Sequence, residues 1–317
     1  MSIVKDPKSL LEQAVGGNRA ALAKLISAIE RDGPQTTQVI KTIFGTASTA
    51  YLVGITGAPG AGKSTLTDKL IRCYRLRGLE VGVIAVDPSS PYSGGAILGD
   101  RIRMGDHASD HGVYIRSMAT RGHLGGLSTS VPLAARALAA AGFQDVLIET
   151  VGVGQVEVEV AGAADTTVVV INPGWGDSIQ ANKAGLMEIA DLFVINKADR
   201  EGVRATKRDI EAMLDLAPKG DWRPRVLETV ASLDRGTDEV FEAILDHRKF
   251  LETSGKLKEI RANRDEEQTM RHLVELAKVD LATFSRGFRA TSLDPLSKAE
   301  EVFAAWLESK SNQTGNS

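Results

Sequence analysis

A glycine-rich run, Gly57–Thr65, directly follows a short apolar stretch, Tyr51–Thr56. Its spacing is a glycine, four variable residues and then Gly-Lys-Ser, which is typical of a phosphate-binding loop between a strand and a helix. Glycines allow successive backbone N–H groups to turn toward one anion at a helix start. A plain glycine-rich turn is the alternative, which the flanking patterns disfavour. The residues expected to bind nucleotide here are Gly57, Ala58, Pro59, Gly60, Ala61, Gly62, Lys63, Ser64 and Thr65.

Two of these side chains have a chemical role of their own. The Lys63 ammonium can reach the β- and γ-phosphates, and we count it as catalytic. The Ser64 hydroxyl is expected to be a magnesium ligand.

A second motif, Asn196-Lys197-Ala198-Asp199, follows the apolar stretch Leu192–Ile195. A carboxylate at Asp199 can accept hydrogen bonds from N1–H and from the exocyclic amine of guanine, and adenine offers no such donor pair. The short motif is weak alone, but its position at a strand end after a phosphate loop favours a guanine site over a polar turn. We therefore expect Asn196, Lys197 and Asp199 to read guanine. The run Ala231-Ser232-Leu233 follows the last apolar stretch, where GTPases place a loop whose backbone contacts the guanine carbonyl.

Three acidic residues are candidates for the metal site. Glu149 directly follows the stretch Val146–Ile148, and an acidic residue at this position can hold magnesium through water. The usual residue is Asp, and the longer Glu suits an indirect contact. Asp87 and Asp100 belong to a Gly- and Ser-containing segment after the second stretch, and either could approach the metal and the γ-phosphate. The alternatives are a buried cap for Glu149 and capped turns for the two aspartates.

Catalysis lacks one familiar element. Small GTPases have a glutamine directly after the glycine that corresponds to Gly152, and this chain has Val153 there. We expect slow hydrolysis by the chain alone. The segment Asn172–Lys183 contains two glycines, a proline and Trp175, which favours a loop that docks on a partner over a helix start alone.

The pattern of apolar stretches predicts the fold. Short stretches rich in Val and Ile alternate with helical segments, which indicates a mostly parallel sheet covered on both faces, a doubly wound α/β P-loop domain. Such sheets bind ligands at the carboxyl ends of their strands. The seven predicted strands are Tyr51–Thr56, Val81–Val86, Val113–Ile115, Val146–Ile148, Thr167–Ile171, Leu192–Ile195 and Val226–Val230.

The chain before and after this region is predicted to be helical. Residues 1–47 contain apolar residues at three- and four-residue spacing, and residues 246–317 repeat that pattern without strands. The predicted divisions are therefore an N-terminal helical segment (1–47), a GTPase domain (48–245) and a C-terminal helical arm (246–317). The arm either packs against a second subunit or is a solvated tail.

Composition excludes several classes of protein. Lys and Arg number 38 against 41 Asp and Glu, a formal net charge of −3, so nucleic acid is not an expected partner. No apolar run approaches the ~18 residues of a membrane span, so no membrane association is expected. The single cysteine, Cys73, cannot form an internal disulfide, which favours the reducing cytoplasm.

Taken together, the motifs resemble those of the MeaB/ArgK family of GTPases, which accompany methylmalonyl-CoA mutase. The resemblance covers nearly the whole chain. The sequences that carry it are GAPGAGKST (57–65), DPSS (87–90), GAILGDRIRM (95–104), ETVGVG (149–154), GDSIQ (176–180) with Lys183, and NKAD (196–199).

The resemblance implies a function and a set of roles. The chain would bind and hydrolyse GTP to GDP with Mg²⁺, gate adenosylcobalamin loading into an acyl-CoA mutase, and protect or reactivate that mutase. Asp87 and Asp100 would belong to one switch segment and Glu149 to a second. Lys183, in a loop that contacts the mutase, would complete catalysis, and the C-terminal helices would form a homodimer. Trp175 replaces a small residue usual in the family, so the partner could be a sibling mutase acting on another branched acyl-CoA.

Two other functions compete with this interpretation. A metallochaperone GTPase of the nickel-insertion class would need a His-rich or Cys-x-x-Cys element, and the chain has neither. An ATP-dependent kinase conflicts with the guanine-reading motif at Asn196–Asp199.

Overall fold

The structure is a computed structural model of the chain. It describes residues 6–31, 35–47, 49–87, 107, 109–119, 130–150, 156–174, 185, 188–218, 220–289, 291 and 294–314. Within these ranges, no helix is both long and apolar enough to cross a membrane.

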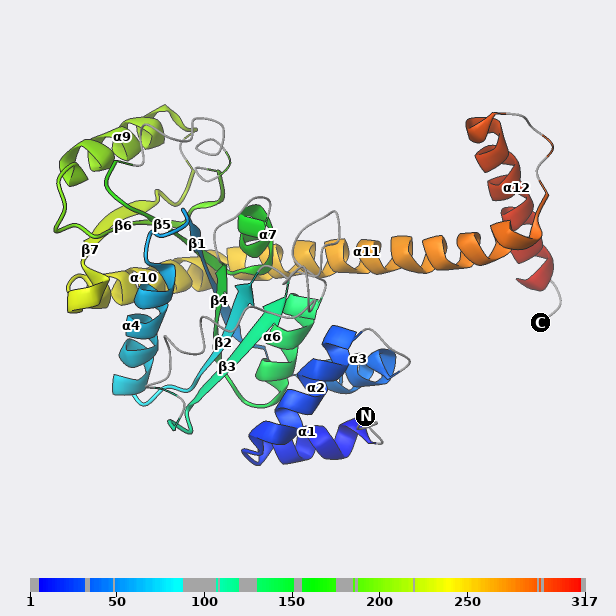
Figure 1. The fold of residues 1–317 in the computed structure, drawn as a ribbon, viewed down its shortest axis with the longest axis horizontal. Helices are drawn as coiled ribbons and strands as arrows, with labels where there is room; N and C mark the ends of the chain where they lie inside the picture. Colours follow the sequence, from blue (N-terminus) through cyan, green and yellow to red (C-terminus); the bar gives the residue numbers. More distant parts are fainter. Residues whose placement is uncertain are drawn as a thin grey trace. The chain divides into compact units, whose positions relative to one another are not determined.

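A seven-stranded parallel sheet forms the centre of the fold (Figure 1), which confirms the predicted class and all seven predicted strands. The strands lie in the order β3-β2-β4-β1-β5-β6-β7, so β1 is central and the order reverses on either side of it. The bounds are β1 Tyr51–Gly57, β2 Val81–Asp87, β3 Val113–Ala119, β4 Asp145–Thr150, β5 Thr166–Ile171, β6 Leu192–Asn196 and β7 Arg225–Thr229.

Strand β3 is longer than its apolar pattern indicated. The sequence predicted a strand that ends at Ile115, but β3 pairs with β2 as far as Ala119 opposite Asp87. The apolar pattern did not predict this extension, because the polar residues Arg116 and Ser117 interrupt it. Arg116 is nevertheless compatible with a strand, since its guanidinium turns to Ser27 and Glu30 on a neighbouring helix.

Alternate residues of the central strands belong to two different cores. In β2, Val81 and Val83 join one buried cluster, whereas Ile84 and Val86 join the other. Period-two alternation places successive side chains on opposite faces, so both faces of the sheet are buried. This double burial explains the unbroken apolar runs in the sequence.

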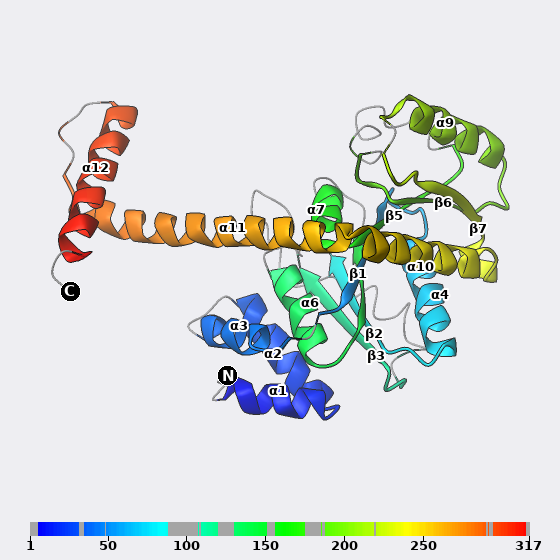
Figure 2. The same ribbon diagram turned by 180° about the vertical axis from the view of Figure 1, so that it is seen from behind.

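Helices from different parts of the chain line these two cores. Helices α4 and α10 contribute to the first cluster, and Figure 2 shows them side by side. Helices α1–α3, α6 and α7 contribute to the second. The helical bounds are α1 Pro7–Val15, α2 Arg19–Arg31, α3 Thr36–Phe44, α4 Lys63–Leu76, α6 Ser130–Ala140, α7 Val156–Ala163, α9 Val203–Leu216, the 3-10 turn η3 Ala231–Leu233, and α10 Thr237–Ser254.

The described parts of the chain form two compact units, which divide after Leu257. Helices α1–α3 lie in the first unit, because Leu25, Ile26 and Ile29 of α2 are buried in the core shared with α6. At the other end, α10 continues past residue 245, where the sequence analysis ended the GTPase domain. His247 and Leu251 of α10 are buried, so this helix is part of the first unit along its whole length.

The second unit contains most of α11 (Lys256–Gly287) and all of α12 (Pro295–Thr314). The indole of Trp306 on α12 donates to Asp280 on α11, and Lys310 pairs with the same carboxylate. These contacts hold the two helices together. Many large apolar side chains of this unit remain exposed, among them Met270, Leu273, Val274, Leu276, Val279, Leu296, Phe303 and Leu307.

Candidate nucleotide-binding site

The predicted motifs lie at the carboxyl ends of β1, β4, β6 and β7. The loop Gly57–Ser64 follows β1, Glu149 lies one residue before the end of β4, Asn196 ends β6, and Ala231 comes soon after β7. Since all pairings in the sheet are parallel, these ends meet at one edge. The topology therefore brings together residues that lie far apart in the sequence.

Two glycines of the phosphate loop have no room for a side chain. Gly57 has φ +125°, and a Cβ there would lie 2.0 Å from the carbonyl oxygen of Val170 on β5. Gly62 has φ +95°, and a Cβ there would lie 2.3 Å from Nδ2 of Asn196. Any other residue would strain the backbone and collide with a neighbour. These positions explain why the spacing of the motif is so restrictive.

Lys63 begins helix α4 and is buried, although it is charged. Its ammonium group donates to the carbonyl oxygens of Gly57 at 2.8 Å and Ala58 at 2.9 Å. A buried ammonium requires such partners to offset its desolvation. These two hydrogen bonds hold the positive charge of Lys63 next to the first two residues of the phosphate loop.

Ser64 and Glu149 are in direct contact. The Ser64 hydroxyl donates to Oε1 of Glu149 at 2.5 Å, and the carboxylate is buried at the end of β4. A hydroxyl beside a carboxylate is a pair of hard oxygen donors of the kind that magnesium prefers. The geometry thus joins two residues that the sequence analysis assigned to the same metal.

The side chain of Asn196 is engaged entirely with protein groups. Its Nδ2 donates to the carbonyl of Ala61 at 2.8 Å, and its Oδ1 accepts from Thr229 Oγ1 and from the backbone N–H of Ala231, each at 3.1 Å. The residue is 3% exposed. Asn196 therefore connects the phosphate loop to the segment after β7.

The next residues of the motif are more accessible. Lys197 adopts a left-handed conformation with φ +60°, and its ammonium donates to the carbonyl of Gly60 at 2.6 Å. Asp199 is exposed. The lysine thus covers the tip of the phosphate loop, and the carboxylate of Asp199 is available to a ligand.

Ala231, Ser232 and Leu233 form the short 3-10 turn η3. Ala231 is buried, whereas Leu233 is 63% exposed. The turn ends at Asp234, which has φ +54°. We call residues 231–234 the base loop.

Several predicted residues lie wholly or partly outside the described part of the structure. Asp87 is the last residue of β2, at the same edge of the sheet, but its side chain is outside the described part of the structure. Asp100 and Lys183 also lie outside the described residues, as does Val153.

Sequence reasoning missed Thr229, which is buried and bonded to Asn196. The sequence shows a threonine near the end of a predicted strand. It does not indicate that Thr229 bonds to Asn196, because the two residues are 33 positions apart and meet only through the pairing of β6 with β7.

The donor groups fit a magnesium nucleotide. The loop has close-approach glycines and a buried ammonium, which suit phosphate, and Ser64 with Glu149 supplies oxygen donors for a divalent cation. Within the described residues, no group of three or more His, Cys, Asp or Glu side chains gathers in a manner suited to another metal.

Comparisons with known proteins agree with this geometry. A protein of Pyrococcus abyssi (strain GE5 / Orsay) is 54% identical over 263 residues, which are 82% of this chain and 81% of the relative. The GTPase ArgK of Escherichia coli (strain K12) is 39% identical over 294 residues, 87% of each chain. A crystal structure titled as an LAO/AO transport system kinase superposes with a TM-score of 0.73 at 30% identity. It covers 96% of this chain and 99% of that one.

The family model of the "methylmalonyl Co-A mutase-associated GTPase MeaB" matches residues 22–284. GTPases of this fold use GTP, GDP and Mg²⁺. The match decides against both alternatives, the nickel-insertion GTPase and the ATP-dependent kinase. The chain belongs to the MeaB family of GTPases.

Proposed function

We propose that this GTPase is the chaperone of an adenosylcobalamin-dependent acyl-CoA mutase, and that GTP hydrolysis gates the loading or protection of the mutase's cofactor. The observation that carries the proposal is the match of residues 22–284 to a family described as mutase-associated. Methylmalonyl-CoA mutase and a sibling enzyme acting on another branched acyl-CoA are the candidate partners.

In the proposed site, the residues divide the work by chemistry. The backbone of residues 57–65 and the Lys63 ammonium would hold the phosphates. Ser64 and Glu149, with Asp87 and Asp100, would hold magnesium, which neutralises phosphate charge when bound. Asp199 would read the guanine edge, and the base loop its carbonyl. Asn196 and Lys197 would contribute to guanine recognition indirectly, since both side chains donate hydrogen bonds to the phosphate loop.

We further propose that the second unit mediates homodimerisation. Its helices expose a run of apolar side chains from Met270 to Val279. Soluble proteins seldom leave such contiguous patches uncovered, and a second copy of the same helices would cover them.

A kinetic experiment tests the function. GTP turnover is measured for the chain alone and with purified methylmalonyl-CoA mutase or a sibling mutase, each with and without adenosylcobalamin. We expect slow turnover alone and a clear increase with one of the two mutases. Equal rates with and without both enzymes would contradict the proposed partner.

A matched variant isolates the phosphate loop in that experiment. Lys63→Ala is expected to lose GTP binding and turnover, because it removes a charge-assisted contact to phosphate. Lys207→Ala is the control, since Lys207 is a partly exposed lysine of the same domain that pairs with Glu228. Equal GTP affinity in the two variants would contradict the role of Lys63.

A further inference from the structure

The base loop ends in an unfavourable backbone conformation. Among the described residues, only Lys197 and Asp234 are non-glycine residues with positive φ. Both belong to segments of the proposed base site. An aspartate tolerates the left-handed region better than most residues, but still at a cost that surrounding contacts must offset.

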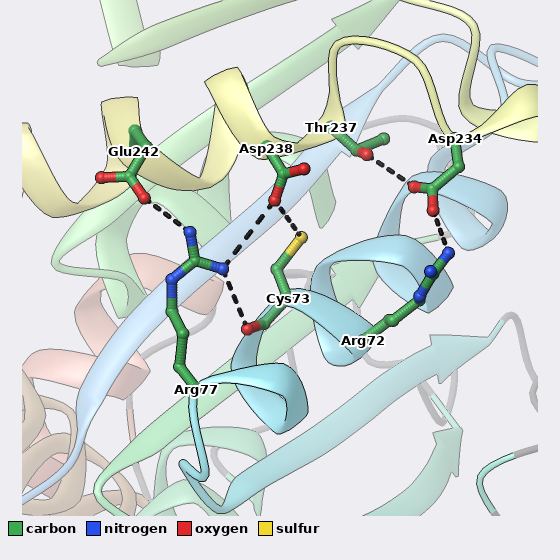
Figure 3. Close-up of polar contacts among 7 residues, drawn as sticks. All are labelled: Arg72, Cys73, Arg77, Asp234, Thr237, Asp238 and Glu242. Carbon is green, nitrogen blue, oxygen red and sulfur yellow. Dashed lines mark hydrogen bonds and ion pairs between the residues drawn. The ribbon is translucent and has the colours of Figure 1, made fainter.

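The carboxylate of Asp234 joins two helices (Figure 3). Its Oδ1 accepts from the hydroxyl of Thr237, the first residue of α10, at 2.7 Å. Its Oδ2 accepts from the guanidinium of Arg72 on α4. Helix α4 is the helix that begins with Lys63 of the phosphate loop. Asp234 thus connects the end of the base loop to the phosphate-binding helix.

The start of the base loop has an equivalent connection. The backbone N–H of Ala231 donates to Asn196, whose amide donates in turn to Ala61 of the phosphate loop. Within the turn, Leu233 N–H donates to the carbonyl of Val230 and Asp234 N–H to that of Ala231. The base loop is therefore a short rigid turn fixed at both ends to elements that carry the phosphate loop.

We propose that Arg72 is a positioning residue for guanine recognition: by pairing with Asp234, it sets the base loop at the distance from the phosphate loop that suits the 6-oxo group of guanine. The inference rests on the proposed role of the base loop. Arg72 would act through the loop and would not touch the nucleotide. No motif singles out Arg72, because it lies in the middle of an ordinary amphipathic helix.

Arg77, the residue that caps the C-terminus of the same helix, provides a matched comparison. Its guanidinium pairs with Glu242 at 2.6 Å and Asp238 at 3.8 Å on α10, and lies 4.2 Å from the ring centre of Phe241. It also donates to the carbonyl of Cys73 (Figure 3). Arg77 therefore connects the end of α4 to α10, and these hydrogen bonds and ion pairs go to residues outside the base loop.

The exposure of Arg72 allows its role in positioning the base loop to be separated from a role in stabilising the fold. The Arg72 side chain is 56% exposed. Exposed ion pairs contribute little to folding, so Arg72→Ala should leave the unfolding midpoint nearly unchanged. Loss of the pair should instead widen the range of base-loop positions. The effect would then appear in base selectivity and not in stability.

The experiment measures binding of three diphosphates to wild type, Arg72→Ala, Arg72→Lys, Asp234→Asn and Arg77→Ala. GDP is compared with 6-thio-GDP, which changes only the 6-oxygen, and with IDP, which lacks only the 2-amino group. All three carry the same phosphates, so the affinity ratios cancel the phosphate contribution. The GDP to 6-thio-GDP ratio reports on the base loop, and the GDP to IDP ratio reports on Asp199.

We expect Arg72→Ala and Asp234→Asn to lower the GDP to 6-thio-GDP ratio about two- to five-fold, the range set by an exposed ion pair. The GDP to IDP ratio should stay at the wild-type value. Arg72→Lys should restore part of the lost selectivity, and Arg77→Ala should change neither ratio. Added salt should lower the GDP to 6-thio-GDP ratio of wild type, because salt screens the exposed pair of Arg72 and Asp234. It should not lower the ratio of Arg72→Ala, which lacks this pair.

The inference alone would be overturned by an unchanged GDP to 6-thio-GDP ratio in Arg72→Ala, or by an equal fall of both ratios, which would indicate general damage to the site. A larger fall in Arg77→Ala than in Arg72→Ala would also overturn it, because selectivity would then follow helix packing. A wild-type protein without any preference for GDP over IDP and 6-thio-GDP would overturn the proposed guanine site as well.

Discussion

The hydroxyl of Ser64 lies 2.5 Å from Oε1 of Glu149, although 85 residues separate the two in the sequence. Strands β1 and β4 are neighbours, and Ile55 of β1 pairs with Glu149, so the end of β4 lies beside the start of the phosphate loop. A glutamate reaches the serine directly here. The longer side chain is thus compatible with the metal role usually filled by aspartate.

This contact leads to a prediction about magnesium. Glu149→Gln removes the negative charge but keeps a hydrogen-bond acceptor for Ser64. Loss of a supporting carboxylate commonly weakens metal binding by about 10–100-fold, so the Mg²⁺ concentration for half-maximal GTP turnover should rise accordingly. Magnesium titrations of turnover provide the measurement, and GDP affinity in EDTA is the control, which should not change. A wild-type magnesium curve in the variant would refute the assignment.

Asp199→Asn is expected to change base preference without affecting the fold. The exposed carboxylate becomes an amide, which presents a donor where guanine also presents donors. Losing charge-assisted hydrogen bonds should weaken GTP binding by about tenfold or more, and xanthine nucleotides should gain. Calorimetry with GDP and XDP measures both changes. Equal GDP affinity in variant and wild type would remove Asp199 from the site.

Much of the site was predictable because its chemistry is local in sequence. The phosphate loop and the motif at Asn196–Asp199 are contiguous, and the alternating apolar stretches fixed the parallel sheet that brings them together. The contacts between motifs were not predictable in the same way. Asn196 bonds to Thr229 and Ala61, and Arg72 pairs with Asp234, across gaps that only the strand order and helix packing close.

The buried cluster around His247 predicts a pH dependence of stability. His247 Nδ1 and Thr166 Oγ1 are 2.8 Å apart, and its ring packs 4.6 Å from that of Trp222. Burial lowers the pKa of His247 to about 4, from 6.5 in an exposed state. The unfolded chain therefore binds a proton below pH 6.5 that the folded chain rejects. The stability linked to this histidine is complete above pH 6.5 and is lost as the pH falls toward 4.

Asp191 faces the same ring, with its Oδ1 3.4 Å from His247 Nε2, and acts in the opposite direction. Burial raises the pKa of Asp191 to about 7, so its linked stability is complete below pH 3.8 and is lost as the pH rises toward 7. The two groups therefore offset each other in the wild type between about pH 4 and pH 6.5.

The variant His247→Asn separates them, because its amide keeps a hydrogen-bonding atom toward Thr166 but does not titrate. Relative to this variant, wild type should lose up to about 3 kcal/mol of unfolding free energy between pH 6.5 and pH 4. Urea unfolding at several pH values measures the difference. Parallel stability curves for the two proteins would show that His247 does not titrate in this window.

Dimerisation should depend on residues after Leu257. A cut near Asp246 would remove buried His247 and Leu251, so truncation after Leu257, where the first unit ends, is the cleaner test. The protein 1–257 should bind GDP like wild type but sediment as a monomer, while the full chain sediments as a dimer at micromolar concentration. A monomeric full chain, or a dimeric truncated one, would contradict the proposed role of the second unit.

The final prediction concerns the control of hydrolysis. Val153 cannot orient water, so the chain alone is expected to turn over GTP slowly. Lys183 lies in the segment proposed to contact the mutase, and a partner that orders this segment could bring the ammonium toward the phosphates. A cation supplied in this way accelerates better-known GTPases by about 10³–10⁵-fold, and a lysine is expected to deliver less. Lys183→Ala should therefore reduce the ratio of mutase-stimulated to basal turnover to nearly one.

Lys207→Ala, which removes a partly exposed lysine paired with Glu228, should keep the wild-type ratio. If Lys183→Ala is stimulated as strongly as Lys207→Ala, another group completes the active site. If the wild type alone already turns over GTP as fast as with the mutase, catalysis does not depend on the partner at all.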